Sequence, residues 1–223
     1  MITKLLQLPV SELTGSVSAA YMVPAESTCL ITLAHGAGAG MNHPFMVSLA
    51  ECLAQAGIAT LRFNFPFTEH GKKRVDTPAI AHKTIEVAIG HARKTFPSLP
   101  LFASGKSFGG RMSSQLLALQ PNIQVRGLIF YGFPLHPAGK PSTDRAAHLK
   151  DILLPMLFLQ GTRDELATLE LIEGVCSTLP TALLTKIEGA DHGFKAGKKD
   201  TIQLLASETA TWINNVLSSK VNT

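Results

Sequence analysis

Short β-rich apolar runs alternate along the chain with longer stretches in which apolar residues recur at helical spacing. The runs that predict strands cover residues 16–22, 28–33, 58–63, 99–104, 125–131, 155–160 and 182–187. The stretches that predict helices cover residues 46–55, 79–96, 111–119, 168–179 and 202–217. The first run alternates weakly and is followed by Pro24, which is typical of an edge strand. Repeated strand-then-helix order predicts an α/β fold with a mostly parallel central sheet and helices on both faces.

The size of the chain is typical of one undivided unit. It has 223 residues, of which 45% are hydrophobic, enough to bury one substantial core. The sequence contains no internal repeat, low-complexity tract or linker, so we expect a single domain over residues 1–223. In a parallel sheet the loops at the carboxyl ends of the strands carry the functional residues.

Charge and composition limit the kinds of partner and the cellular location that the sequence predicts. The formal net charge of +4 comes from scattered lysines and arginines, with the densest groups at residues 72–74 and 195–199. Neither group is interleaved with aromatic residues, so we expect no nucleic-acid partner. The apolar amino terminus is interrupted too early for a signal peptide, and no other window is long enough to span a membrane. The three cysteines have no paired spacing and are typical of reduced thiols. We expect a cytoplasmic protein, although export by an unrecognised route stays open.

A serine stands at a sharp turn between a predicted strand and a predicted helix. Residues 105–109 read Gly-Lys-Ser-Phe-Gly, directly after the apolar run over 99–104. Flanking glycines let the backbone bend tightly enough to expose the serine hydroxyl, which becomes a nucleophile when a base lies beside it. The pattern predicts that Ser107 is the nucleophile of an acyl-transfer enzyme.

Two parts of this sequence resemble nucleotide-binding motifs, but each lacks a glycine that its motif requires. The string over residues 105–107 resembles the end of a phosphate-binding loop, which requires a glycine where Pro100 stands. A dinucleotide fingerprint over residues 35–40 would require its third glycine at Met41. Metal-ligand spacing is also missing, because there is no His-Glu-x-x-His pair and no close Cys/His set. We therefore expect neither a cofactor nor a metal.

The predicted base is His192, and the predicted orienting acid is Asp164. His192 follows the last predicted strand and precedes the last predicted helix, so its loop can carry the imidazole to Ser107. The acid must lie at a strand end, after the serine and before the histidine, if it is to hold the imidazole in its productive tautomer. Asp164 meets these conditions. Its rivals are Glu165, which we expect to point elsewhere, and Asp191, which is poorly placed to reach the neighbouring ring.

The other histidines compete less well for the role of base. Those in polar helix or loop contexts away from a strand end are His70, His82, His91 and His148. We expect His35 to hydrogen-bond to the backbone, while His43 and His136 stay open as pocket residues.

A second glycine-rich loop, over residues 35–40, fits an oxyanion hole. When a serine sits at a strand-to-helix turn, one backbone donor comes from the loop after an early strand and the other from the residue after the nucleophile. By that rule the donors are the N–H groups of Ala37 and Phe108. A plain glycine-rich turn between a strand and a helix is the alternative.

These residues together resemble the α/β-hydrolase superfamily across nearly the whole chain. The size of the chain resembles its compact, dienelactone-hydrolase-like members. Residues 61–66, 105–112, 133–141 and 160–164 resemble a bacterial subgroup of predicted hydrolases, which is similar to animal testis-expressed and non-specific-lethal-complex proteins. The resemblance implies the α/β-hydrolase fold and a Ser-His-Asp triad. Dienelactone hydrolases proper carry a cysteine where Ser107 stands, so the resemblance does not imply their specificity.

The predicted reaction is the hydrolysis of a small ester or thioester through an acyl-enzyme, with water as the second substrate. Residues 132–151, where many relatives insert a large lid, form a short segment, and a minimal cap predicts an open, shallow pocket. Two alternatives stay open. One is a catalytically silent binding or scaffold protein with the same fold, against which the intact Ser, Asp, His order argues. The other is a serine peptidase, which no feature of the sequence separates from an esterase. The oligomeric state is not predicted.

Overall fold

Strands and helices alternate along most of the chain, as the hydrophobic pattern predicts. The structure, a computed structural model, describes residues 2–219. Its strands are β1 (Ile2–Ser11), β2 (Gly15–Val23), β3 (Cys29–Ala34), β4 (Ile58–Phe63), β5 (Leu101–Lys106), β6 (Leu128–Tyr131), β7 (Met156–Gly161) and β8 (Ala182–Ile187). Its helices are α1 (Pro44–Gln55), α2 (Pro66–Glu69), α3 (Pro78–Thr95), α4 (Phe108–Leu119), α5 (Leu169–Ser177) and α6 (Thr201–Ser218), with the 3-10 helix η1 (Asp144–Asp151).

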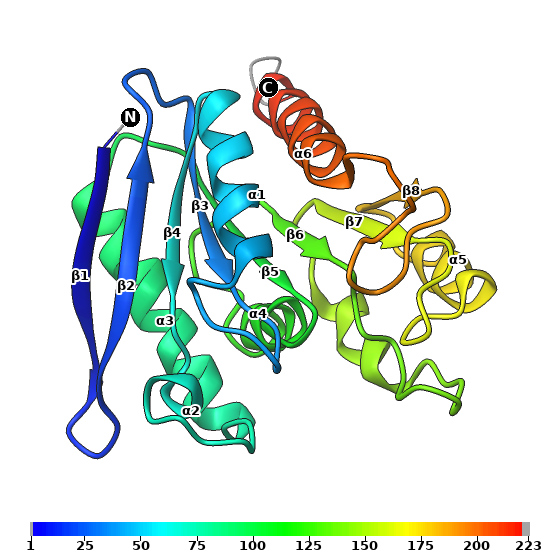
Figure 1. The fold of residues 1–223 in the computed structure, drawn as a ribbon, viewed down its shortest axis with the longest axis horizontal. Helices are drawn as coiled ribbons and strands as arrows, with labels where there is room; N and C mark the ends of the chain where they lie inside the picture. The colour runs from blue at the N-terminus through cyan, green and yellow to red at the C-terminus, as the bar shows by residue number, and fades with distance from the viewer. Residues whose placement is uncertain (1, 220–223) are drawn as a thin grey trace.

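All these strands belong to one sheet, in the order β1-β2-β4-β3-β5-β6-β7-β8 (Figure 1). β1 pairs with β2 and β2 with β4 in antiparallel fashion. From β4 to β8 every pairing is parallel. This arrangement confirms the predicted mostly parallel sheet. Between β6 and β7 the chain adds only loops and η1, so the sheet carries a minimal cap.

The structure contains a strand at the amino terminus that the hydrophobic pattern does not predict. The hydrophobic pattern assigns no strand to residues 2–11, yet they form β1, in which Leu8 and Val10 are buried and most other residues are exposed. Apolar residues on the exposed face, such as Leu5, hide the alternation that marks a strand. The expectation that β2 is an edge strand is therefore wrong, because β1 covers it and forms the edge itself. Pro9 of β1 lies beside a register shift, which an edge strand tolerates.

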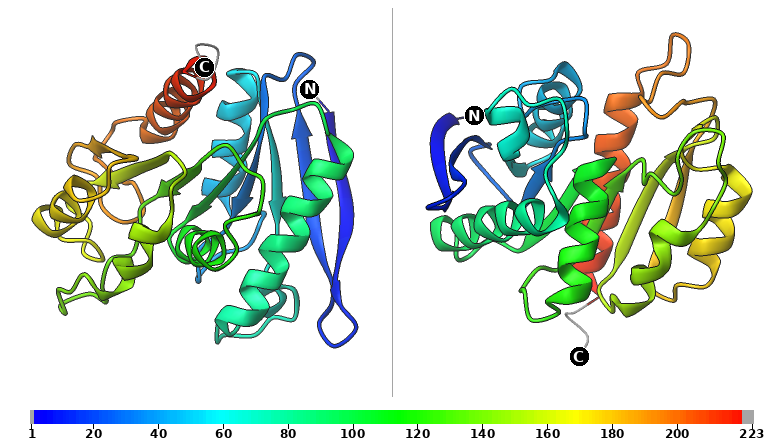
Figure 2. Two further views of the ribbon diagram at one scale, coloured as in Figure 1. Left: turned by 180° about the vertical axis from the view of Figure 1, so that it is seen from behind. Right: turned by 90° about the horizontal axis from the view of Figure 1, so that it is seen from below.

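The core has two layers, one on each face of the sheet. Ile31 and Leu33 of β3 belong to a cluster with residues of α1 and α6, whereas Leu30, which precedes them in the alternation, belongs to a cluster with residues of α3 and α4. Figure 1 shows α1 and α6 in front of the sheet, and the view from behind in Figure 2 shows α3 and α4 covering its other face. The prediction of helices on both faces is confirmed.

The junction of β5 and α4 is packed backbone against backbone. A Cβ placed on Gly105 would overlap the amide nitrogen of Gly110, and one on Gly109 would lie 2.5 Å from the carbonyl oxygen of Ala34. Real Cβ atoms do not approach that closely, so only glycine lets α4 start against the ends of β5 and β3. These contacts fix where the first turn of α4 begins.

Substituting Gly109 with alanine is expected to lower the free energy of unfolding by about 1–3 kcal/mol, because the added methyl group must displace the β3 backbone. Urea unfolding followed by circular dichroism measures this loss. The control is Gly90→Ala, since Gly90 lies exposed in α3 and a Cβ added there would have no heavy atom within 4 Å, so alanine is expected to stabilise by roughly 0.5–1 kcal/mol. Equal unfolding midpoints for Gly109→Ala and the unsubstituted protein would contradict the tight packing.

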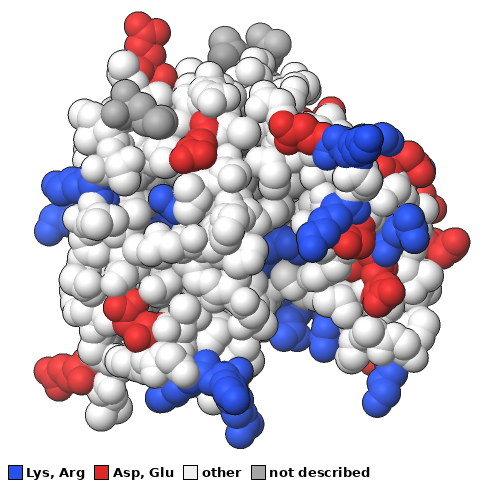
Figure 3. Space-filling model, viewed as in Figure 1, with Lys and Arg blue, Asp and Glu red and all other residues white. Residues whose placement is uncertain are grey.

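Charged side chains lie apart on the face drawn in Figure 3, where groups of Lys and Arg alternate with Asp and Glu and leave wide uncharged areas. The positive excess of the sequence therefore does not gather into one continuous patch on this face. Within residues 2–219, none of the helices combines the length and the hydropathy needed to cross a membrane.

Candidate active site

Three of the predicted site residues meet at the carboxyl ends of the parallel strands. Ser107 follows β5, Asp164 follows β7 and His192 follows β8. The Nε2 atom of His192 lies 2.9 Å from Ser107 Oγ, and its Nδ1 atom lies 2.7 Å from Asp164 Oδ2. The three side chains thus form one continuous chain of hydrogen bonds.

The backbone at Ser107 is held in an unusual conformation. Its φ of 51° and ψ of −115° lie in a region that costs a non-glycine residue about 1–3 kcal/mol. The Ser107 N–H donates to the Tyr131 carbonyl at 3.2 Å, and the Arg111 N–H donates to the Ser107 carbonyl at 3.1 Å. Together with the close glycine contacts, these bonds hold the sharp turn that directs Oγ toward His192.

Asp164 is buried and every observed contact of its carboxylate is with a hydrogen-bond donor. Oδ2 accepts from Gln160 Nε2 at 2.6 Å as well as from the His192 ring, and Oδ1 accepts from the Leu166 N–H at 2.7 Å. Because an ionised carboxylate only accepts, His192 carries its proton on Nδ1 and leaves Nε2 free to accept from Ser107. This is the tautomer that a general base requires.

The rival carboxylates lie elsewhere. Glu165 is exposed, and the Asp191 carboxylate accepts from the backbone N–H of Lys195 at 2.9 Å. The pattern of the sequence did not single out Gln160, whose side chain is fully buried at the end of β7 and orients Asp164. A polar residue at the end of a strand that is otherwise apolar is the signal that could have found it.

The predicted oxyanion donors, the N–H groups of Ala37 and Phe108, belong to two segments that meet at Ser107. Phe108 is the first residue of α4, where backbone N–H groups have no acceptor within the helix. The loop that carries Ala37 passes close to the elbow, because a Cβ on Gly36 would lie 3.6 Å from Ser107 Cβ. Both residues are therefore near the serine, which the proposed role of their N–H groups requires.

A cavity of about 330 Å³ opens beside Ser107 and His192. Besides these two, its lining consists of Gly36, Ala37, Gly38, Ala39, His43, Phe45, Met46, Lys106, Leu166 and Gly193. Apolar side chains and small residues predominate, which suits an apolar group of a small substrate. Of the histidines left open above, His43 lines this cavity, whereas His136 bonds to Pro137 and Thr168 instead.

His35 supports the loop rather than the cavity. Its Nε2 accepts from the Phe65 N–H at 3.0 Å and its Nδ1 donates to the Gly36 carbonyl at 2.8 Å, as expected of a residue bonded to the backbone. Burial lowers the pKa of His35 to about 4, so the ring stays neutral near pH 7.

Comparison with known proteins identifies the family. Residues 27–217 match the family described as "Alpha/beta hydrolase domain". This chain is an α/β-hydrolase. Its fold is similar to a dienelactone hydrolase from Anabaena variabilis, with a TM-score of 0.78, 20% identity and 96% of this chain and 97% of that chain covered. It is also similar to XC6422 from Xanthomonas campestris, a serine hydrolase without a lid, with a TM-score of 0.73, 21% identity and 94% of each chain covered. At these identities the likeness concerns the fold.

A curated relative of the hydrolase comes from Mycobacterium tuberculosis and is named as a candidate phosphoribosyl transferase. The two are 28% identical over 195 residues, which cover 85% of this chain and 42% of the relative. The chain thus spans less than half of that relative's length.

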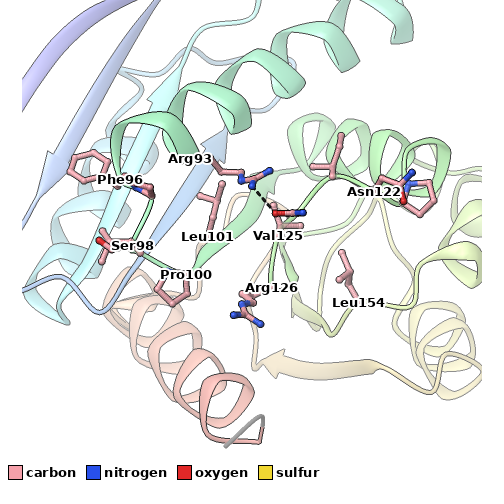
Figure 4. Close-up of a pocket in the computed structure, with 14 residues that line it drawn as sticks. Arg93, Phe96, Ser98, Pro100, Leu101, Asn122, Val125, Arg126 and Leu154 are labelled. Carbon is pink, nitrogen blue, oxygen red and sulfur yellow. Dashed lines mark hydrogen bonds between the residues drawn. The ribbon is translucent and has the colours of Figure 1, made fainter. Parts of the chain in front are cut away.

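A second hollow of the hydrolase, about 590 Å³, lies at the opposite ends of the strands (Figure 4). Leu101 begins β5 there, and Arg126 lies just before β6. Arg93 donates from Nη2 to Gln124 at 2.6 Å, as the dashed line in Figure 4 shows. The lining residues include no histidine, cysteine or carboxylate, so no base among them activates the Ser98 hydroxyl.

Between residues 2 and 219, the hydrolase has no group of three or more His, Cys, Asp or Glu side chains that could hold a metal ion. That a cofactor is not needed stays a prediction.

Proposed function

We propose that this α/β-hydrolase cleaves small esters or thioesters through a covalent acyl-enzyme on Ser107. The observation that carries the proposal is the hydrogen-bonded chain from Ser107 through His192 to Asp164, which borders a small apolar cavity. Serine hydrolases among the proteins with a similar fold support it.

Acylation begins when Ser107 Oγ attacks the carbonyl carbon of the substrate while His192 Nε2 takes the hydroxyl proton. Asp164 stabilises the imidazolium that forms. The N–H groups of Ala37 and Phe108 donate to the oxyanion, and each such donor is worth roughly 3 kcal/mol in the transition state. The tetrahedral intermediate then collapses, and the leaving alcohol or thiol takes the proton from Nε2.

Deacylation repeats these steps with water as the nucleophile. His192 Nε2 takes a proton from water as the oxygen attacks the acyl carbon, and the same N–H groups hold the new oxyanion. The bond to Ser107 Oγ breaks, the proton returns to Oγ, and the carboxylic acid leaves.

The cavity and the minimal cap limit the acyl group. A space of about 330 Å³ beside Ser107 accommodates a short acyl chain, and η1 is too small to cover a long one. Esters, thioesters and peptide bonds all present a carbonyl to Ser107, so a serine peptidase is the enzymatic alternative.

The substrate proposal is tested with p-nitrophenyl acetate, butyrate and palmitate. We expect kcat/KM to be on the order of 10–100-fold higher for butyrate than for palmitate, because most of the long chain would extend beyond the cavity beside Ser107. Palmitate cleaved as well as butyrate would contradict the small acyl site, and a folded protein that cleaves none of these esters would contradict the proposed ester hydrolysis.

A catalytically silent scaffold is the alternative of another class. A fluorophosphonate separates the two, since it reacts with an activated serine and leaves an inert one unlabelled. Membership of the subgroup similar to animal testis-expressed and non-specific-lethal-complex proteins stays a prediction, as does a cytoplasmic location. Phosphoribosyl transfer is not proposed, because the chain spans only 42% of the relative that carries that description.

A further inference from the structure

Lys106, inside the elbow, has no part in the steps above and yet contacts the loop of the base. Its Nζ donates to the backbone carbonyl of His192 at 2.6 Å, across 86 positions of sequence. The side chain is partly buried and lines the same cavity as Ser107. An ammonium group donating to a carbonyl makes one of the stronger hydrogen bonds available to a protein.

The surroundings of Lys106 Nζ are shaped to hold it. The ring centroid of Phe194 lies 5.1 Å from Nζ and that of Phe45 lies 6.0 Å away, and the two rings stack at 5.8 Å. Such distances allow cation–π attraction. Gly132, with a φ of +72°, also leaves space for the amine, because a Cβ there would lie 3.1 Å from Nζ and 3.6 Å from Asp164 Oδ2.

The loop that carries His192 is long, and hydrogen bonds of Asp191 with Phe194 and Lys195 close a turn around His192. It joins β8 to α6 through residues 188–200. The Ala190 carbonyl accepts from the Arg163 N–H, and the Phe194 carbonyl accepts from Thr201 Oγ1. Between these two points, the bond from Lys106 holds the His192 carbonyl from outside the loop.

Phe194 shows that this part of the loop is constrained. It is one of two non-glycine residues within residues 2–219 with a positive φ, at 62°, and the other is Ser107. A phenylalanine tolerates this conformation only where its surroundings hold it. Here its ring is buried between Phe45 and Lys106, so the contacts of Lys106 hold both the carbonyl of His192 and the ring two residues further on.

We propose that Lys106 is a positioning residue that fixes the backbone of His192 and thereby the distance between His192 Nε2 and Ser107 Oγ. The proposal rests on the function proposed above, in which that distance decides the transfer of the serine proton. A misplacement of about 1 Å at a reacting pair can cost on the order of 100-fold in rate.

The charge of Lys106 gives the proposal a pH dependence. Burial lowers the pKa of Lys106 to about 8, against the opposing effect of Asp164 and Asp191, and the charge is present below that pH. Within residues 2–219, the other titratable groups that line the cavity beside Lys106 are His192 itself and His43, which precedes α1. The rest of α1 contributes Phe45, and the turn after β6 contributes Gly132. Above pH 8 the neutral amine donates more weakly, so the rate with which Ser107 reacts is expected to fall there.

The test compares Lys106→Met with Lys195→Met, a matched control because Lys195 lies on the loop that carries His192 and its side chain is exposed. Methionine keeps the length and packing of the lysine stem and removes the donor. Hydrogen–deuterium exchange of the Phe194 N–H, which donates to the Asp191 carbonyl across His192, is expected to be roughly 10-fold faster in Lys106→Met and unchanged in Lys195→Met. Labelling by a fluorophosphonate, and kcat for p-nitrophenyl butyrate, are expected to fall about 10- to 100-fold in Lys106→Met with KM changed little.

Each outcome decides the proposal. Unchanged exchange in Lys106→Met, or faster exchange with an unchanged labelling rate, would overturn it. If Lys106→Met does not fold, the pH dependence of fluorophosphonate labelling is measured on the unsubstituted protein instead. A labelling rate that stays level from about pH 7 to about pH 9.5, on either side of the lysine pKa, would overturn the role of the ammonium. If the unsubstituted protein is not labelled at all, the proposed function fails, and the exchange comparison still shows whether Lys106 fixes the loop.

Discussion

Replacing Ser107 with alanine is expected to lower kcat for p-nitrophenyl butyrate by on the order of 10⁶-fold, because the acyl-enzyme can no longer form. The proposed base and oxyanion donors stay in place, so a residual rate above that of buffer is expected. Alanine occupies the same strained turn as serine and removes only a hydroxyl, so the free energy of unfolding is expected to change by roughly 0.5 kcal/mol or less.

The measurement is initial-rate hydrolysis together with intact mass after exposure to a fluorophosphonate. The unsubstituted protein should gain one adduct and Ser107→Ala none. Ser177→Ala is the matched control, since Ser177 lies exposed on α5 and donates to the Gly174 carbonyl. Turnover by Ser107→Ala within tenfold of that of the control would remove Ser107 from the mechanism.

The hydrophobic pattern predicts the sheet well where strands are buried and poorly where they are not. β3, β4 and β7 are buried along their whole length and stand out as short, mostly apolar runs. β1 is not predicted, because its apolar residues Ile2 and Leu5 are exposed to solvent and break the alternation of apolar and polar residues that marks a strand. Which residues of β1 are exposed depends on how the β1–β2 hairpin pairs with β4. That pairing is part of the tertiary structure and is not visible in the local sequence.

Chain order suffices to nominate Ser107, Asp164 and His192 because a parallel sheet collects the carboxyl ends of its strands at one edge. Lys106 and Gln160 could not be assigned in the same way. Their roles depend on which atoms face each other across β5, β7 and β8, and those distances are set by register and loop conformation. The single domain over residues 1–223 stays a prediction.

Local rules of conformation are broken where the site is built. Ser107 and Phe194 have positive φ values without being glycine, and they lie on the two loops that supply the serine and the histidine. Strain of this kind persists only when packing outweighs it, here through the glycines beneath α4 and the stacked rings beside Lys106. Sequence patterns describe the usual conformation of each residue type. They can therefore predict the role of a residue and still miss the strained backbone conformation on which that role depends.

Replacing Asp164 with asparagine is expected to lower kcat by about 10⁴-fold while the fold is kept. If the introduced side chain keeps its oxygen toward the Leu166 N–H, its amide group faces the donors on Gln160 and His192. His192 then moves its proton from Nδ1 to Nε2, where it donates to Ser107 and cannot act as a base. If the amide is turned round, a buried N–H group faces the Leu166 N–H, at a cost of about 1–3 kcal/mol.

The control for that substitution is Glu165→Gln, the same chemical change one residue on, at an exposed side chain. Its kcat is expected to stay within twofold of the unsubstituted value, because the carboxylate that contacts the His192 ring is that of Asp164. Nitrogen NMR of the imidazole distinguishes the two tautomers directly and should show the proton on Nδ1 in Glu165→Gln and on Nε2 in Asp164→Asn. A kcat for Asp164→Asn close to that of the control would mean that the Asp164 carboxylate is not needed for the basicity of His192, and the proposed role of Asp164 would be wrong.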